Sequence, residues 1–169
     1  MSVSMHHVST AAFERGLTAF ANVLRKAAAH AAEKKIEERV FTEARLFPDM
    51  LPLRAQVFIA ADTVRGTIAR LQGQEMPKWE DNEVTFAELI ARVERTLEVV
   101  RGVSAAALDG SETRETVRKV QGKERTFTGL DYLVKFALPN FYFHTTTAYD
   151  ILRHNGVALG KGDYLGSFD

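Results

Sequence analysis

The chain has 169 residues, of which 46% are hydrophobic and 26% are charged, so its size and apolar content are typical of one soluble domain spanning residues 1–169. Lysine plus arginine and aspartate plus glutamate both number 22, and the resulting net charge of zero excludes the basic surplus of a general nucleic-acid-binding protein. The absence of cysteine excludes disulfides, thiolate metal sites, iron–sulfur clusters and cysteine nucleophiles.

The sequence contains no recognisable targeting or membrane-spanning segment. Residues 1–10 are polar, and Glu14 interrupts any apolar run that could serve as a signal peptide. The longest uncharged stretch, residues 136–149, is too short to cross a bilayer and contains Pro139, Asn140 and His144. We therefore expect a cytoplasmic protein that does not associate with a membrane.

The first two helices are indicated by apolar side chains spaced three or four residues apart, which is typical of amphipathic helices. The first helix is expected to follow a cap at Ser9 or Thr10. The second is expected to begin at an Asp49 cap and to end at Gly73. Their apolar stripes are Phe13, Leu17, Phe20, Leu24, Ala28 and Ala31 in the first helix, and Leu53, Val57, Ala60, Val64, Ile68 and Leu71 in the second.

The third and fourth helices have clearer boundaries. Thr85 and Glu88 form a capping box, in which each side chain bonds to a backbone N–H near the other, and Gly102 is expected to end the third helix in a left-handed conformation. The fourth helix is expected to begin at Pro139, which suits a first helical position, and to end at residues 155–156. The apolar stripe of the third helix is Phe86, Ile90, Val93, Leu97 and Val100.

The remaining segments predict short elements. Residues 130–138 indicate a short helix behind Thr128, and residues 116–127 fit either a small β-hairpin or a charged, solvated loop. The Gly-Lys-Gly run at residues 160–162 is predicted to be a turn, because it lacks the strand–loop–helix context of a phosphate-binding loop. The fold class predicted from these elements is all-α, an antiparallel four-helix bundle, to which the hairpin alternative adds two short strands.

The fourth helix carries many polar and aromatic side chains. Asn140, His144 and Thr147 are four and three residues apart, so they share one face, while Tyr142 and Tyr149 lie on a second stripe. Polar groups on an inward face need hydrogen-bond partners. Two interpretations remain open: these side chains bond to neighbouring helices and fix their register, or they orient a ligand or metal ion in an interhelical cavity.

The second helix offers partners for His144. Gln56 and Asp62 are candidates, as are a tyrosine hydroxyl and a water molecule. Asp62 and Arg65 lie three residues apart, and we expect an exposed ion pair there, the alternative being that they reach a cavity. The full set of candidate ligand-pocket residues is Gln56, Asp62, Asn140, Tyr142, His144, Thr147 and Tyr149.

The histidines do not have the spacing of a metal site. They occur at positions 6, 7, 30, 144 and 154, and neither a His-x-x-x-His nor a Glu-x-x-His pair is present. His6 and His7 are expected to lie in a mobile N-terminal segment. From spacing alone we expect no bound transition metal, with His144 as the only candidate ligand. The sequence also lacks the Gly-x-Ser-x-Gly motif of a serine nucleophile.

Part of the fourth helix resembles a known family. The run Pro139-Asn140-Phe141-Tyr142-Phe143-His144, followed by residues 151–157 (ILRHNGV), is similar to the signature of a small family of unknown function in the DinB-like (YfiT-like) superfamily of metal-dependent four-helix bundles. Residues 160–161 and 163–166 also fit that family. The resemblance implies a bundle over most of the chain and does not indicate a reaction.

The resemblance also implies a divalent metal as cofactor. In the wider superfamily, the metal is held by one histidine from the second helix and a His-x-x-x-His pair on the last long helix. Only His144 matches that pattern in this sequence, because Asn140 and Ala148 occupy the positions four residues away and the second helix has no histidine. Hard oxygen donors and one imidazole make a poor transition-metal site.

Two functions therefore remain open. The first is a binding or regulatory protein that holds a small molecule in a cavity around His144, and the second is a DinB-like transferase or hydrolase with a reduced or atypical metal site. The three consecutive aromatic residues 141–143 point about 100° apart around the helix and cannot all enter one core, so we also expect a homodimer. The balanced charge predicts no nucleic-acid partner.

Overall fold

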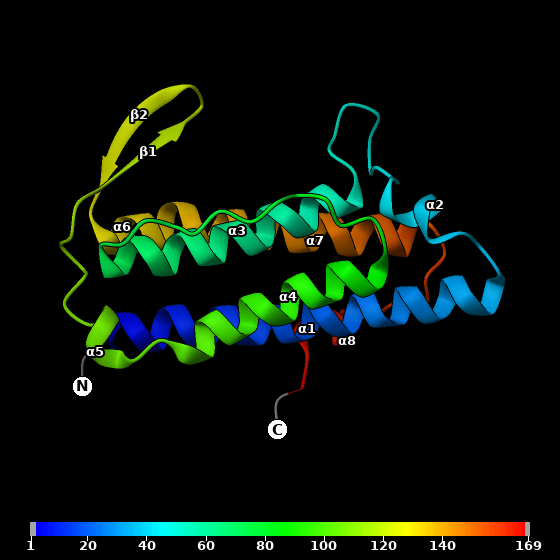
Figure 1. Cartoon of the computed structure of the whole chain (residues 1–169), viewed down its shortest axis with the longest axis horizontal. Helices are drawn as coiled ribbons and strands as arrows, with labels where there is room; N and C mark the ends of the chain where they lie inside the picture. Colours follow the sequence, from blue (N-terminus) through cyan, green and yellow to red (C-terminus); the bar gives the residue numbers. More distant parts are fainter. Residues whose placement is uncertain (1–2, 168–169) are drawn as a thin grey trace.

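The computed structural model describes residues 3–167 and shows four long helices arranged as a bundle (Figure 1). The long helices are α1 (Met5–Lys34), α3 (Leu53–Gln72), α4 (Phe86–Gly102) and α7 (Leu138–His154). The shorter elements are α2 (Glu38–Thr42), α5 (Ala105–Leu108), β1 (Thr116–Val120), β2 (Lys123–Phe127), α6 (Gly129–Tyr132), the π-helical turn η1 (Leu133–Ala137) and α8 (Lys161–Leu165). The predicted helical bundle is confirmed.

The long helices pack as two antiparallel pairs, α1 with α4 and α3 with α7, and α3 also packs against α4 (Figure 1). α3 and α4 run in the same direction, because the segment between them crosses the length of the bundle (Figure 1). We call residues 74–84 of this segment the strap. A short turn would have made α4 antiparallel to α3, so the strap sets the order of the helices.

Two predicted boundary signals are confirmed. The Glu88 carboxylate accepts hydrogen bonds from the Thr85 N–H at 2.9 Å, and the Glu88 N–H donates to the Thr85 hydroxyl at 3.3 Å, which completes the capping box at the start of α4. Gly73 ends α3 in the left-handed conformation, with φ of 73°.

The predicted start of the first helix is wrong. α1 begins at Met5, and the Ser4 hydroxyl caps it by accepting a hydrogen bond from the His7 N–H at 3.2 Å. His6 and His7 therefore lie in the first helical turn rather than in a mobile segment. The His6 N–H donates to the Asp109 carboxylate at 3.0 Å, which joins the start of α1 to the end of α5.

One other predicted boundary and two predicted conformations are also wrong. α3 begins after Pro52 instead of Asp49, because a proline disfavours the helical conformation in the residue before it. α4 ends at Gly102 as predicted, but Gly102 is not left-handed, because the chain leaves the helix through Val103, which is buried and extended. Gly160 caps α8 and residues 161–162 are its first two residues rather than a turn, because the Asp163 carboxylate accepts a hydrogen bond from the Gly160 N–H at 2.9 Å.

The chain between α5 and α7 forms the hairpin and a continuous helical segment. Of the two alternatives for residues 116–127, the hairpin is the one that forms, with Gln121 and Gly122 at its turn. Both turn residues have positive φ, as a tight two-residue hairpin turn requires. The predicted short helix becomes α6 and η1, which run without a break into α7. The wider turn of η1 lies just before Pro139, whose ring would otherwise clash with the preceding helical turn.

The core is built from the inward stripes of the long helices. Phe13 of α1 meets Phe141 of α7 edge to face, with ring centroids 5.4 Å apart. The approach is close because Gly16 has no side chain, since a Cβ at that position would lie 2.5 Å from Phe141 Cε1. Gly16 therefore sets how closely α1 and α7 pack.

The three consecutive aromatic side chains of α7 point in different directions. Phe141 is buried in the core, whereas Tyr142 and Phe143 are 42% and 57% exposed. The Phe143 ring packs edge to face against the His144 ring, with centroids 5.2 Å apart. The homodimer expected from these aromatic residues stays a prediction.

No helix among residues 3–167 is long and apolar enough to cross a membrane.

The register of α4 can be tested by truncating Leu97, which is 8% exposed. We expect Leu97→Ala to lower the free energy of unfolding by about 2–5 kcal/mol, because it removes buried methyl groups and leaves a cavity. Val99→Ala, two residues along at a position that is 37% exposed, serves as the control and should cost much less. Urea denaturation that gives the same loss for both variants would contradict the register.

Candidate functional site

The buried polar face of α7 is joined to α3 by a hydrogen bond between His144 and Gln56. His144 is 9% exposed and Gln56 is 2% exposed, and His144 Nδ1 lies 2.7 Å from Gln56 Oε1. The Gln56 amide nitrogen donates to the carbonyl oxygen of Leu51 at 2.9 Å, which turns Oε1 toward His144. Because an amide oxygen only accepts, the neutral imidazole carries its proton on Nδ1 and donates it.

The environment of His144 keeps its ring neutral. Burial lowers the pKa of His144 from 6.5 to about 4, because taking the imidazole out of water disfavours the charged form. At neutral pH the ring is therefore a neutral hydrogen-bond donor, with a lone pair on Nε2.

Asn140 and Thr147, which share the face of His144, also bond within the protein. Asn140 donates from its side-chain nitrogen to the Thr63 hydroxyl of α3 at 2.7 Å. Thr63 donates in turn to the Ile59 carbonyl at 2.7 Å, and Thr147 donates to the Phe143 carbonyl at 2.8 Å. We call the contacts of Gln56 with His144 and of Thr63 with Asn140 the α3–α7 seam. They link the two helices at two successive levels.

The second stripe of α7 lines a pocket on the other side of the helix. This pocket has a volume of about 250 Å³ and lies between α1, α7 and α8. We call it the tyrosine pocket, after Tyr142, Tyr149 and Tyr164 in its wall. The remaining lining residues are Ala12, Arg15, Gly16, Ala19, Phe20, Val23, Thr145 and Leu165.

A further pocket of about 200 Å³ includes Asn140 and Asp62 among its lining residues. It is bounded by α3, the strap, β1, α6, η1 and α7.

The candidate residues predicted from the sequence are thus divided among three places rather than lining one cavity. Gln56 of α3 is buried beside His144 and Thr147 of α7, Tyr142 and Tyr149 line the tyrosine pocket, and Asn140 and Asp62 line the further pocket.

An arginine cluster between α3 and α4 was missed by the sequence analysis. The side chains of Arg65 and Arg92 are 3% and 1% exposed. The Asp62 carboxylate accepts from both, at 3.0 and 3.1 Å, so its predicted ion pair with Arg65 exists, but the arginine is buried instead of exposed. Asp81 and Glu83 of the strap pair with Arg92 at 2.7 and 3.0 Å. The strap therefore brings the charges that make burial of these arginines tolerable.

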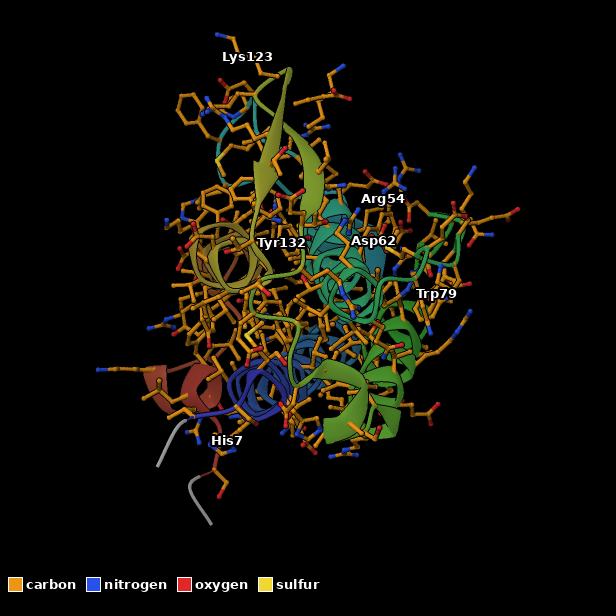
Figure 2. All side chains as sticks on the ribbon, turned by 90° about the vertical axis from the view of Figure 1, so that its left-hand side faces the viewer. His7, Arg54, Asp62, Trp79, Lys123 and Tyr132 are labelled. Carbon is orange, nitrogen blue, oxygen red and sulfur yellow. The ribbon has the colours of Figure 1, made fainter. Side chains whose placement is uncertain are left out.

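Trp79 fixes the strap against the same cluster. Its ring lies 3.4 Å from the guanidinium carbon of Arg65 and 3.6 Å from that of Arg95. Figure 2 labels Trp79 on the strap and Asp62 on α3. The sequence signals for the cluster were the Asp62–Arg65 spacing and a tryptophan with four acidic residues in the aperiodic strap, which do not by themselves indicate where the strap packs.

Comparison with known proteins now identifies the family. Residues 5–165 match the family described as a domain of unknown function, DUF1993. The chain belongs to the DUF1993 family. It is also similar to the crystal structure of a DinB family member protein from Shewanella denitrificans, with 40% sequence identity, coverage of 96% of this chain and 92% of that chain, and a TM-score of 0.89. This DUF1993 chain therefore has a DinB-like fold, as the resemblance implied. No curated protein matches it.

The residues of this DUF1993 chain do not fit the metal site of the DinB-like superfamily. Across from His144, α3 presents Gln56, whose oxygen is engaged with the ring, and Asn140 is engaged with Thr63. Among residues 3–167, no group of three His, Cys, Asp or Glu side chains is placed to hold a metal ion. A transition metal in a structural or catalytic site takes at least three such ligands, so the seam is a hydrogen-bonded contact between helices.

The lowered pKa of His144 predicts a pH dependence of stability. Between its ordinary pKa of 6.5 and the folded value of about 4, the unfolded chain binds a proton that the folded chain does not, so this residue makes the protein less stable as the pH falls through that range. The loss due to His144 should approach about 3 kcal/mol near pH 4. His144→Gln, which cannot take up this proton, should show a shallower decline.

Urea denaturation at a series of pH values measures this effect. His154→Gln, at an exposed position on the same helix, is the control for removing an imidazole from α7. Parallel stability profiles for the unmodified protein and His144→Gln would show that the ring is not held neutral.

Proposed function

We propose that the protein binds a small organic molecule in the tyrosine pocket. The observation that carries this proposal is the pocket itself, which combines an apolar floor with three tyrosine side chains in one hollow between helices. Such a combination is typical of small-molecule sites, in which apolar surface provides affinity and a few polar groups orient the ligand.

The hollow exists because α1 carries small side chains along this face. Ala12, Gly16 and Ala19 follow one another at steps of four and three residues, so they form one stripe of the helix. Phe20 and Val23 continue the floor, and both are buried. Larger residues at the three small positions would fill the space that α8 encloses.

The tyrosines supply polar groups to the pocket, together with Arg15 and Thr145. Burial raises the pKa of Tyr142, and the nearby Tyr164 raises it further, so this hydroxyl stays protonated at neutral pH and can donate a hydrogen bond. Tyr164 lies with its ring edge to face against Tyr149, at 5.9 Å between centroids. The Thr146 hydroxyl donates to the Tyr164 oxygen at 2.9 Å, which holds the ring in place.

α8 is fixed as the outer wall of the pocket. Lys26 of α1 forms an ion pair with Asp163 at 2.6 Å, and Asp163 also caps α8. The nitrogen of Lys26 and the neighbouring N–H of Gly160 both lower the pKa of Asp163, so the carboxylate remains charged through the physiological range. The pocket is therefore preformed, which reduces the entropic cost of binding.

The proposal predicts that a flat, neutral aromatic alcohol binds in the tyrosine pocket. With 2-naphthol as the probe, two-dimensional amide NMR should show saturable shifts along residues 12–23 and in α8. Ala12→Leu fills the pocket and should abolish these shifts. The control, Ala91→Leu, makes the same change at an exposed position on α4 and should leave them unchanged.

Equal binding of 2-naphthol to Ala12→Leu and Ala91→Leu would contradict the proposal. So would shifts that fall outside α1, α7 and α8. Thermal unfolding of both variants checks that each is folded before binding is compared.

A further inference from the structure

The further pocket, bounded by α3, the strap, β1, α6, η1 and α7, carries two arginines that α3 and the hairpin bring together. Arg70 comes from the last turn of α3 and Arg118 from the middle of β1, and both line the pocket. Figure 1 shows the hairpin rising at the end of the bundle where α3 finishes and α6 begins, and Figure 2 labels Tyr132 on that side. We call this hollow the arginine pocket.

The acidic side chains of the arginine pocket are already neutralised. Asp62 and Asp81, which line it, both accept from the buried Arg92, at 3.1 and 2.7 Å. Glu83 also pairs with Arg92, Asp62 pairs with Arg65, and Arg95 lies close to Arg65. Three negative and three positive charges balance in that cluster, so it does not cancel the charge of Arg70 and Arg118.

Arg70 and Arg118 form no ion pair with a carboxylate of residues 3–167. Arg70 donates to the Gly66 carbonyl at 2.8 Å, and its guanidinium carbon lies 5.7 Å from the Tyr132 ring centroid. The guanidinium carbon of Arg118 lies 5.7 Å from the Phe136 ring centroid. A guanidinium group beside an aromatic ring is held in place while its N–H edge remains available for a carboxylate or phosphate.

The other walls of the arginine pocket are mostly apolar. Tyr132 and Phe136 are stacked, with centroids 5.6 Å apart and planes 22° apart, and Phe58 and Met76 add apolar surface. Asn140 uses its side-chain nitrogen on Thr63, so its carbonyl oxygen is left as an acceptor. The hairpin is anchored to the same ring pair, because Phe127 meets Tyr132 edge to face at 6.2 Å.

We propose that the arginine pocket binds a small organic anion, a carboxylate or a phosphate monoester that carries a flat apolar group. The anionic group lies between Arg70 and Arg118, and the apolar group packs along Phe58, Tyr132 and Phe136. A hydroxyl or amide N–H on the ligand donates to Asn140. This site is separate from the tyrosine pocket, with which it shares no lining residue.

Phenyl phosphate is the probe that tests this proposal, measured by isothermal titration at low ionic strength and by amide NMR. Arg118→Gln should weaken binding by about tenfold or more, because it removes a charge-assisted hydrogen bond. The control is Lys119→Gln, which removes the same charge from the next residue of β1, where the side chain points to the opposite face of the hairpin. It should leave the affinity within about twofold, because Lys119 does not line the arginine pocket.

Two other probes and one variant complete the test. Benzyl alcohol, which lacks the charge, should bind far more weakly, and inorganic phosphate, which lacks the ring, should do the same. Ala12→Leu, which blocks the tyrosine pocket, should leave phenyl phosphate binding intact, so that each site can fail without the other. Equal weakening of phenyl phosphate binding by Arg118→Gln and Lys119→Gln would overturn the proposal. Equal affinity for inorganic phosphate and phenyl phosphate would overturn the proposed packing of an apolar group against the aromatic wall.

Discussion

A polar side chain buried between two helices must find a hydrogen-bond partner, and this requirement organises the interface between α3 and α7. An unpaired buried polar group costs about 1–3 kcal/mol. The hydrogen bond from His144 to Gln56, at 2.7 Å, pairs both side chains. The Gln56 side-chain nitrogen also donates to the carbonyl oxygen of Leu51, which precedes α3. The contact of Asn140 with Thr63 is a second such bond, one turn away along α7. Together they fix the register of the two helices.

The polar side chains of the α3–α7 seam bond to one another, and the tyrosine and arginine pockets lie beside the seam. Tyr142 and Tyr149 project from α7 toward α1 and α8, where small residues on α1 leave space. Asn140 borders the pocket that the strap and the hairpin complete. In both places the long helices provide the frame, and short connecting elements complete the walls. Function is often carried by such connections because they vary without disturbing the core.

The helices were predictable because their information is local. Thr85 and Glu88 form the capping box that marks the start of α4, and the spacing of Leu97 and its apolar neighbours predicts which face of α4 is buried. The four-residue spacing on α7 predicted that Asn140 and His144 share one face. Gln56 of α3 was among the partners predicted for His144. What the sequence could not supply was the path of segments without periodicity. The strap buries Arg65 and Arg92 by bringing Asp81 and Glu83 to them, and α8 folds back onto α1 through Asp163, so both depend on contacts between residues far apart in the chain.

The most direct measurement is the protonation state of His144 in the folded protein, read from the nitrogen resonances of its ring by long-range ¹H–¹⁵N NMR. At about pH 6, well above the folded pKa of about 4, the ring should be neutral with its proton on Nδ1, because of the two neutral tautomers only that one donates to Gln56. The resonances should move to the neutral average of both tautomers in Gln56→Leu, in which the acceptor is removed. A protonated imidazolium ring at that pH, or a proton on Nε2 in the unmodified protein, would contradict the account of the seam.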